Sequence, residues 1–423
     1  MHHFLYHNGT LHAEDVPVSR IIEAVGTPCY IYATETLVRH YRIFAEAFRG
    51  LDARIHFAVK ANASLAVLRT LAQQGCGADV VSGGELQLSL QAGIPAERIV
   101  FSGVGKTEEE LELALKAGVY QINVESLPEL GALDTVARHL GVRAPVAVRV
   151  NPDIGAGGHE KITTGNRENK FGIEWNMATQ VCHHAASLPG IDFKGLAVHI
   201  GSQITDLAPF RAAFSRIVAL TRILRAEGLD ISRLDLGGGL GIPYKDADTA
   251  PPLPADYASM VRDTVSGTGC TLLLEPGRLI AGNAGILVSR VVYVKDSQTR
   301  TFIILDAGMN DLIRPAMYDA RHAIIPLAEP EAGSAGQTCD VVGPVCESSD
   351  VFARNVMLPP LQAGDRIAFL SAGAYGAVMA SQYNTRPLVP EVLVKGDRFA
   401  ITRRRPTLQD MTALESMPDW LSS

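Results

Sequence analysis

The sequence has few cysteines, no long apolar run and no concentration of positive charge. Its six cysteines form no CxxC pair, which argues against a zinc knuckle and against a disulfide framework. No run of about eighteen apolar residues occurs and MHHFLYHNG at the start has no apolar signal core, so we expect a cytoplasmic protein with reduced thiols and no membrane span. No cluster has metal-ligand spacing, so we expect no required metal.

The charge balance limits the kinds of partner. The formal net charge is −7, and the densest basic stretch is the short run 403–405. Nucleic acid and anionic membranes both need concentrated Lys and Arg, so neither is expected as the main partner. The apolar fraction of 47% and the charged fraction of 20% are ordinary for a globular protein. A chain of 423 residues is too long for one compact core, so we expect two domains.

Short apolar runs alternate with helix-like stretches through the first two thirds of the chain. The runs are nearly all apolar, which is typical of parallel strands covered by helices, and the helix-like stretches repeat apolar residues every three to four positions. A doubly wound open sheet would suit the same alternation, but a count of eight units favours a (β/α)8 TIM-type barrel. The strand candidates are 55–59, 78–81, 99–102, 120–124, 146–150, 194–200, 233–236 and 271–275, and the helix candidates include 64–74, 84–92, 107–117 and 208–226.

The alternation ends near residue 280. ILVSRVVYV and RTFIILDAG have strand patterns with no helix between them, and Gly/Pro-rich turns and further strand-like runs follow. We therefore expect a barrel over 31–278 and a mostly β domain over 279–423. The N-terminal segment 1–30 contains short strands and would pack with that β domain.

Residues that could take part in binding or catalysis follow the barrel strands. Barrels of this type carry their active sites at the carboxyl ends of the strands. Lys60 ends the first strand, in FAVKAN, and Asp79 lies in the second strand. His199 opens HIGSQ, three glycines follow LDL at 237–239, and Glu275 opens EPGR. Each has an ordinary alternative: a lysine can reach solvent, a histidine can be structural, and glycines can form a tight turn. Their occurrence on one rim favours a common site.

The chemistry that these groups share is that of pyridoxal phosphate. We expect the apolar strand to favour the uncharged amine of Lys60, which can form a Schiff base with an aldehyde. The glycines offer backbone N–H groups to a phosphate, Glu275 could keep a pyridine nitrogen protonated, and the imidazole of His199 could stack on the ring.

Seven motifs in order resemble one family. FAVKAN, GADVVSGGE, HIGSQ, LDLGGGLGIPY, EPGR, GPVCESSD and GAYG look like the series of the diaminopimelate decarboxylase family, within the fold-type III (alanine racemase-like) pyridoxal phosphate enzymes. The resemblance covers essentially the whole chain. It implies a cofactor-binding barrel followed by a β domain, a homodimer with active sites at the interface, and decarboxylation of meso-diaminopimelate to L-lysine and carbon dioxide.

The resemblance also implies roles for residues at matching motif positions. Lys60 would form the Schiff base, His199 would stack on the cofactor, and Cys346, from the neighbouring subunit, would be the proton donor. The segment 157–172 resembles the family's mobile loop over the active site. The cofactor would further be bound by Asp79, Ser202, Gly237, Gly238, Gly239, Glu275, Gly277, Arg278 and Tyr375, and the substrate by Arg278, Arg314, Tyr318, Glu347 and Tyr375.

Alternative functions leave some of the same motifs unused. Ornithine and arginine decarboxylases share the fold, but their substrates have only a distal cation, whereas this chain offers Arg314 and Tyr318 for an anion and Glu347 for a cation. A racemase would give no role to CESSD and RPAMY, and a non-catalytic carrier of the cofactor would resemble a lone barrel. SGVGKT at 102–107 is not a phosphate loop of the Walker type, because Val100 stands where a glycine is needed.

Overall fold

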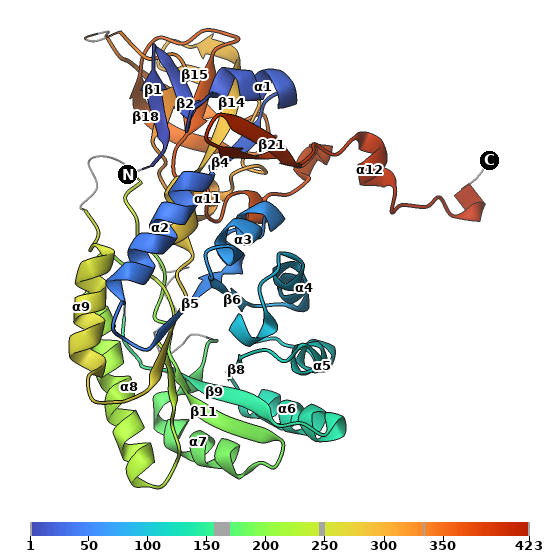
Figure 1. Cartoon of the computed structure of the whole chain (residues 1–423). Coiled ribbons are helices and arrows are strands. Elements are labelled where there is room, and N and C mark those ends of the chain that lie inside the picture. Colours follow the sequence, from blue (N-terminus) through green and yellow to red (C-terminus); the bar gives the residue numbers. More distant parts are fainter. Residues whose placement is uncertain (1, 156–169, 245–249, 332, 334, 422–423) are drawn as a thin grey trace. The chain divides into compact units, whose positions relative to one another are not determined.

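The computed structural model describes residues 2–155, 170–244, 250–331, 333 and 335–421. The chain divides into two compact units (Figure 1), one formed by Thr36–Asn283 and the other by Met1–Glu35 together with Ala284–Ser423. The predicted mobile-loop segment 157–172 lies almost entirely outside the described residues. None of the helices in the described ranges is long and apolar enough to cross a membrane.

The first unit is a closed barrel of eight parallel strands. Each strand pairs in parallel with the next around the ring, and the ring closes because the last strand pairs with the first, Leu273 lying opposite Arg54. The predicted TIM-type barrel is therefore confirmed. The strands are β5 (Ala53–Ala58), β6 (Gly77–Val80), β7 (Ile99–Phe101), β8 (Gln121–Val124), β9 (Ala144–Asn151), β11 (Ile191–Ala197), β12 (Arg233–Asp235) and β13 (Thr271–Leu274).

Helices cover the outside of the barrel (Figure 1). They begin and end at residues with clear local reasons: α5 opens on a capping box between Thr107 and Glu110 and ends at Gly118, which has the left-handed conformation that favours glycine. The main covering helices are α3 (Leu65–Ala72), α4 (Gly83–Gln91), α5 (Glu108–Ala117), α6 (Leu127–Leu140), α7 (Ala178–Ser187), α8 (Ala208–Ala226) and α9 (Pro254–Val265).

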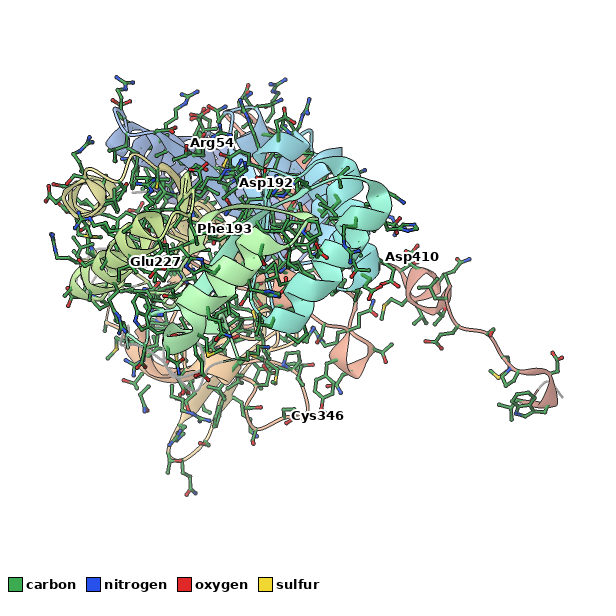
Figure 2. The ribbon with its side chains drawn as sticks, turned by 90° about the horizontal axis from the view of Figure 1, so that it is seen from below. Arg54, Asp192, Phe193, Glu227, Cys346 and Asp410 are labelled. Carbon is green, nitrogen blue, oxygen red and sulfur yellow. The ribbon has the colours of Figure 1, made fainter. Side chains whose placement is uncertain are left out.

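The strand direction separates two faces of the barrel. Arg54 and Asp192, labelled in Figure 2, are the second residues of β5 and β11 and so mark the amino-terminal face. Lys60 follows the end of β5 in the 3-10 turn Val59–Ala61, and Glu275 follows the end of β13, so both belong to the opposite, carboxyl-terminal face. The fold thus gathers the predicted cofactor residues of the barrel on the face where such barrels carry their sites.

The second unit is mostly β, as predicted. A three-stranded sheet contains β1 (Phe4–His7), β2 (Thr10–Ala13) and β3 (Val16–Pro17), and the central strand of the larger sheet is the twelve-residue β14 (Gly285–Asp296). The first half of β14 pairs with β4 (Cys29–Ala33) and β19, and its second half pairs with β15. The remaining strands of the larger sheet are β15 (Thr301–Leu305), β16 (Ile324–Pro326), β17 (Gln337–Val342), β18 (Val351–Leu358), β19 (Arg366–Phe369), β20 (Glu391–Lys395) and β21 (Arg398–Arg403).

Candidate active site

The predicted amine is paired with a carboxylate. Nζ of Lys60 lies 2.7 Å from Oδ2 of Asp79, whose side chain is fully buried, and the lysine side chain is 34% exposed. The parallel register between β5 and β6 sets this contact, because it places Asp79 beside Ala58, two residues before the lysine. The apolar run predicts surroundings that favour the uncharged amine. The structure adds a carboxylate partner, which holds the amine at the carboxyl end of the strand.

His199 is a neutral, oriented imidazole. Its pKa lies well below the usual value for histidine because the ring is buried and because Arg149 and Lys60 add positive charge nearby. The backbone N–H of Gly238 donates to Nδ1 at 3.2 Å, so the ring proton is assigned to Nε2. An imidazole held in this way offers a flat face and one N–H donor.

The three glycines allow a turn to pass very close to its neighbours. A Cβ added to Gly238 would lie 2.1 Å from the backbone oxygen of Glu275, and Gly239 has φ of 109°. The N–H groups of Gly237 and Gly238 already donate to Asp235 and His199. Among the described residues the N–H of Gly239 has no acceptor, so it is the glycine donor still available to an anion.

Glu275 is a buried carboxyl group beside a second one. Its pKa lies well above the usual range because of burial and because Asp235 and Asp79 carry negative charge nearby. The pKa of Asp235 is also raised, chiefly by burial, although hydrogen bonds from Asn123 and Gly237 oppose that rise. The barrel face therefore contains a carboxyl group that keeps its proton to a higher pH than an ordinary glutamate does.

Arg278 is positioned by two neighbours on the same unit. It opens the short helix α10 (Arg278–Ala281) and is buried. Its guanidinium donates to Oγ of Ser202 at 2.9 Å and to the hydroxyl of Tyr244. Gly277 lets the preceding turn approach β5, since an added Cβ would lie 3.0 Å from the Cβ of Ala58. Ser202 and Arg278, both predicted site residues, are thus in direct contact.

Arg314 belongs to the second unit, where it opens α11 (Arg314–Tyr318) and is buried. Nη1 of Arg314 donates to Nε2 of His322 at 2.8 Å, and Nδ1 of His322 lies 2.8 Å from the carbonyl oxygen of Leu370, to which it donates. These contacts fix both side chains of the pair. Tyr318 is at the other end of α11 and is partly exposed.

Cys346 and Glu347 lie in the loop after β17. Cys346 is exposed (Figure 2), and its backbone N–H faces Oδ1 of Asn384 at 3.4 Å. The hydroxyl of Tyr383 donates to Oε1 of Glu347 at 2.6 Å. The loop itself is held by the buried Asp350, whose Oδ2 accepts the N–H of Val345 at 2.7 Å. The loop therefore exposes a thiol and a carboxylate, and its backbone is held in place by Asp350.

Tyr375 lies in the same unit in a turn with positive φ. Its φ of 55° is the left-handed conformation, which is uncommon for a residue with a side chain. The following Gly376 cannot be replaced without a shift, because an added Cβ would lie 2.5 Å from the backbone oxygen of Ala372. The local backbone thus fixes where the tyrosine side chain starts.

The barrel residues fit pyridoxal phosphate. An amine that could bind the aldehyde and a proton-holding carboxyl group lie on the same face, and the glycine turn leaves a backbone N–H available for the phosphate. One oxygen of Asp79, Oδ1, is buried without a hydrogen-bond partner in the described part of the chain. An orphaned carboxylate oxygen beside an amine is a polar group for which a bound ligand could supply the partner.

Several residues that shape the site were not predicted from the sequence. Asp235 and Tyr244 lie within the LDLGGGLGIPY motif, so the motif itself could have pointed to them. Asn123 and His322 carried no signal, because the partner of Asn123 is distant in the sequence and His322 belongs to no motif.

Comparisons with known proteins agree on one family. Residues 34–282 match the family model described as pyridoxal-dependent decarboxylase, pyridoxal binding domain. The diaminopimelate decarboxylase of Zymomonas mobilis is 48% identical over 99% of both chains, and that of Vibrio cholerae is also 48% identical over 99% of both. The crystal structure of diaminopimelate decarboxylase from Helicobacter pylori complexed with L-lysine is 40% identical with a TM-score of 0.90, and the match covers 94% of this chain and 99% of the other.

Proposed function

This chain belongs to the pyridoxal-dependent decarboxylases, among the diaminopimelate decarboxylases, and from that premise we propose that it converts meso-diaminopimelate to L-lysine and carbon dioxide. The observation that carries the proposal is the gathering of an amine, a neutral imidazole and a proton-holding carboxyl group on one face of the barrel. The choice of diaminopimelate rests on the nearly full-length identity with relatives of that name.

In this proposal the barrel residues bind and orient the cofactor. When bound, pyridoxal phosphate supplies an electron sink for the carbon–carbon bond that breaks. Lys60 would hold it covalently through the amine that Asp79 now contacts, and His199 would lie against the ring. Ser202 and the N–H of Gly239 would bind the phosphate, while Glu275 would face the ring nitrogen.

The distal end of the substrate requires recognition of both charges. Diaminopimelate carries a second carboxylate and a second ammonium, so its pocket needs an anion binder and a cation binder. We assign the carboxylate to Arg278, Arg314 and Tyr318, because a guanidinium fork matches a planar carboxylate. Glu347 takes the distal ammonium, and Tyr375 contacts both substrate and cofactor. Binding at the distal end orients the scissile carboxylate. Contacts far from the reacting carbon thus help to place the bond that breaks.

Cys346 completes the reaction by delivering a proton. After carbon dioxide leaves, the thiol gives its proton to the α-carbon, which becomes a CH₂ group of lysine. The exposed position of Cys346 suits a thiol that serves a neighbouring copy. We therefore include in the proposal a homodimer, acting in the cytoplasm, in which each site combines the barrel of one copy with Cys346 and Glu347 of the other.

Carbon dioxide release from purified protein tests the proposal. meso-Diaminopimelate should be decarboxylated far faster than ornithine or lysine, and turnover should require added pyridoxal phosphate after the cofactor has been stripped. The LL-isomer, which lacks the D-centre, is the matched control and should give no lysine. Equal turnover of ornithine, or turnover of the LL-isomer, would contradict the assignment.

A further inference from the structure

Buried polar side chains form a continuous path across the inside of the barrel to Glu275. Asn123 on β8 donates from Nδ2 to Oδ2 of Asp235 at 2.8 Å and to Oγ of Ser102 at 3.1 Å. Gln121 donates to Oδ1 of Asn123 at 2.8 Å and so fixes the orientation of its amide. Asp235 is in turn hydrogen-bonded to Glu275. Because β8 and β12 are not neighbours in the ring, the contact between Asn123 and Asp235 crosses the interior.

The hydrogen bonds distinguish the two carboxyl groups. Asp235 accepts at both oxygens, from Asn123 at Oδ2 and from the N–H of Gly237 at Oδ1, the latter at 3.0 Å. In the described residues, the hydrogen bond that Glu275 accepts from outside the pair is a long one of 3.5 Å from Ser102. Two carboxylates in contact cannot both be ionised in a buried site at little cost, so the pair holds one proton. The donors around Asp235 stabilise its negative charge and leave that proton on Glu275.

The surrounding charges act in the same direction. Asp79 raises the pKa of both carboxyl groups, while the positive charge of Lys60 opposes the rise at Glu275. Burial, together with the negative charge of Asp235, also raises the pKa of Tyr257 on α9. The three carboxyl groups of Asp79, Asp235 and Glu275 outnumber the single amine of Lys60. This excess of acidic groups favours retention of a proton on one of them.

We propose that Asn123 and Asp235 are positioning residues that keep the shared proton on Glu275, ready for the ring nitrogen of the cofactor. The second half of this statement rests on the proposed function. When Glu275 meets the ring nitrogen, its O–H bond breaks and an N–H bond forms, so the proton moves and the total charge is unchanged. The Asn123 amide, through Asp235, then sets how the proton is divided between the two carboxyl groups.

A metal site or a purely structural polar core would fit this geometry less well. The described residues contain no group of three His, Cys, Asp or Glu side chains arranged to hold an ion. A structural core would need hydrogen bonds but no distinction between the two carboxyl groups. The unequal supply of donors to Asp235 and Glu275 is the feature for which a structural role gives no reason.

Infrared spectra of the full-length apoprotein test the proposal without any activity measurement. The difference between wild type and Glu275→Gln at neutral pH should contain the band of a protonated carboxyl group, and its intensity should be followed against pH. Asn123→Ala removes a donor to the Asp235 anion, so the proton should pass in part from Glu275 to Asp235, and the midpoint at which the pair loses it should move up by at most roughly one to two pH units. Gln121→Leu, which only frees the amide, should move it the same way by less.

The opposite change should have the opposite sign. Asp235→Asn removes the neighbouring negative charge, so Glu275 should ionise at lower pH. Asp134→Asn, a buried carboxyl on α6 that binds the N–H of Gly190 at 2.7 Å, is the matched control and should leave the midpoint unchanged. Circular dichroism reports whether each variant folds. The proposal is overturned if the Glu275→Gln difference contains no carboxyl band, or if both Asn123→Ala and Gln121→Leu fold yet leave the midpoint in place.

Adding pyridoxal phosphate separates this inference from the proposed function. In the wild type the band should disappear as the proton passes to the ring nitrogen. A band that responds to the variants as expected, in a protein that binds no cofactor, would support the carboxyl pair and contradict the proposed function. If the protein decarboxylates diaminopimelate but its carboxyl band is the same in the Asn123 and Gln121 variants, the proposed function is supported and the carboxyl pair is contradicted.

Discussion

Nη1 of Arg314 donates to Nε2 of His322 at 2.8 Å, with the imidazole fixed from its other side by the carbonyl oxygen of Leu370. Both side chains are buried. A guanidinium that contacts a fixed imidazole keeps its N–H groups in a defined plane, and a defined plane favours bidentate binding of a carboxylate. His322 therefore acts on any anion bound by Arg314 without touching it.

Replacement of His322 by Leu should weaken substrate binding more than chemistry. Loss of the acceptor removes a contact that orients Arg314. A hydrogen bond to a charged group contributes roughly 1.5–3 kcal/mol, so KM for meso-diaminopimelate should rise about tenfold or more while kcat changes little. His322→Gln, which can still accept from Arg314, should restore much of the affinity. Steady-state kinetics check both, and a fall in kcat at unchanged KM would contradict the assigned role.

Lys60→Ala should abolish covalent attachment of the cofactor. In the wild type, borohydride should fix pyridoxal phosphate to the chain, and the modified peptide should contain Lys60. The variant should lose the visible absorption of the bound cofactor and almost all turnover, because it lacks the amine held at the end of β5. Lys194→Ala, at an amine paired with Asp192 in β11, is the control and should keep both. Label persisting on the chain of the Lys60 variant would show that the lysine is misassigned.

The barrel was predictable because its strands and helices follow from apolar patterns that repeat along the chain and can be seen in short segments. Eight apolar runs separated by amphipathic stretches predict eight strands and their order, and the strand pairs agree with that prediction. The surroundings of Lys60 were not predictable in the same way. An apolar run describes its own strand, whereas Asp79 reaches the amine through the register of the next strand. The expectation of an uncharged amine was made without that neighbour, and it stays a prediction.

The contacts among the site residues were not predictable for a related reason. Motifs identify residues that occur close together in the chain, such as Gly277 and Arg278. Tyr244 and Ser202 meet Arg278 only because three different strand ends converge on one face. A polar residue such as Asn123 looks ordinary in the sequence, and its significance depends on a partner 112 positions away.

The two halves of the proposed site should complement each other between copies. Lys60→Ala and Cys346→Ala should each be nearly inactive, since one lacks the cofactor amine and the other lacks the proton donor. If each site takes these residues from different copies, a mixture of the two variants after dissociation and reassociation forms heterodimers with one intact site. Random pairing should then restore about a quarter of the wild-type activity.

The control for complementation is a mixture that cannot form an intact site. Lys60→Ala mixed with a Lys60→Ala, Cys346→Ala double variant should remain inactive at every ratio. Size-exclusion chromatography should confirm that the single variants keep the mass of a dimer. Failure of the first mixture to regain activity, with dimers still forming, would mean that Lys60 and Cys346 act within the same copy or that Cys346 is not the proton donor.

His56 should make the protein less stable in acid. Burial lowers the pKa of this β5 residue to about 4, so between pH 6.5 and 4 the unfolded chain takes up a proton that the folded barrel does not. The contribution of His56 to the free energy of unfolding is complete above about pH 6.5. It is lost as the pH falls through this window, by about 3 kcal/mol in total. His56→Asn should be less stable at neutral pH, because it loses the bond to the carbonyl oxygen of Arg98, but it should lack this part of the acid loss.

Glu85 supplies a comparison of opposite sign. Burial raises its pKa to about 7, so its contribution is complete below the unfolded value of 4.5 and is lost as the pH rises toward 7. Glu85→Gln keeps an oxygen that accepts the N–H of Val81. It should reduce the loss of stability between about pH 4.5 and 7 and leave the acid side unchanged. Unfolding midpoints of the cofactor-free protein from about pH 4 to about pH 8 measure both slopes. If His56→Asn retains the full acid loss, the histidine is protonated in the folded barrel, and the acid loss must come from buried groups elsewhere in the chain.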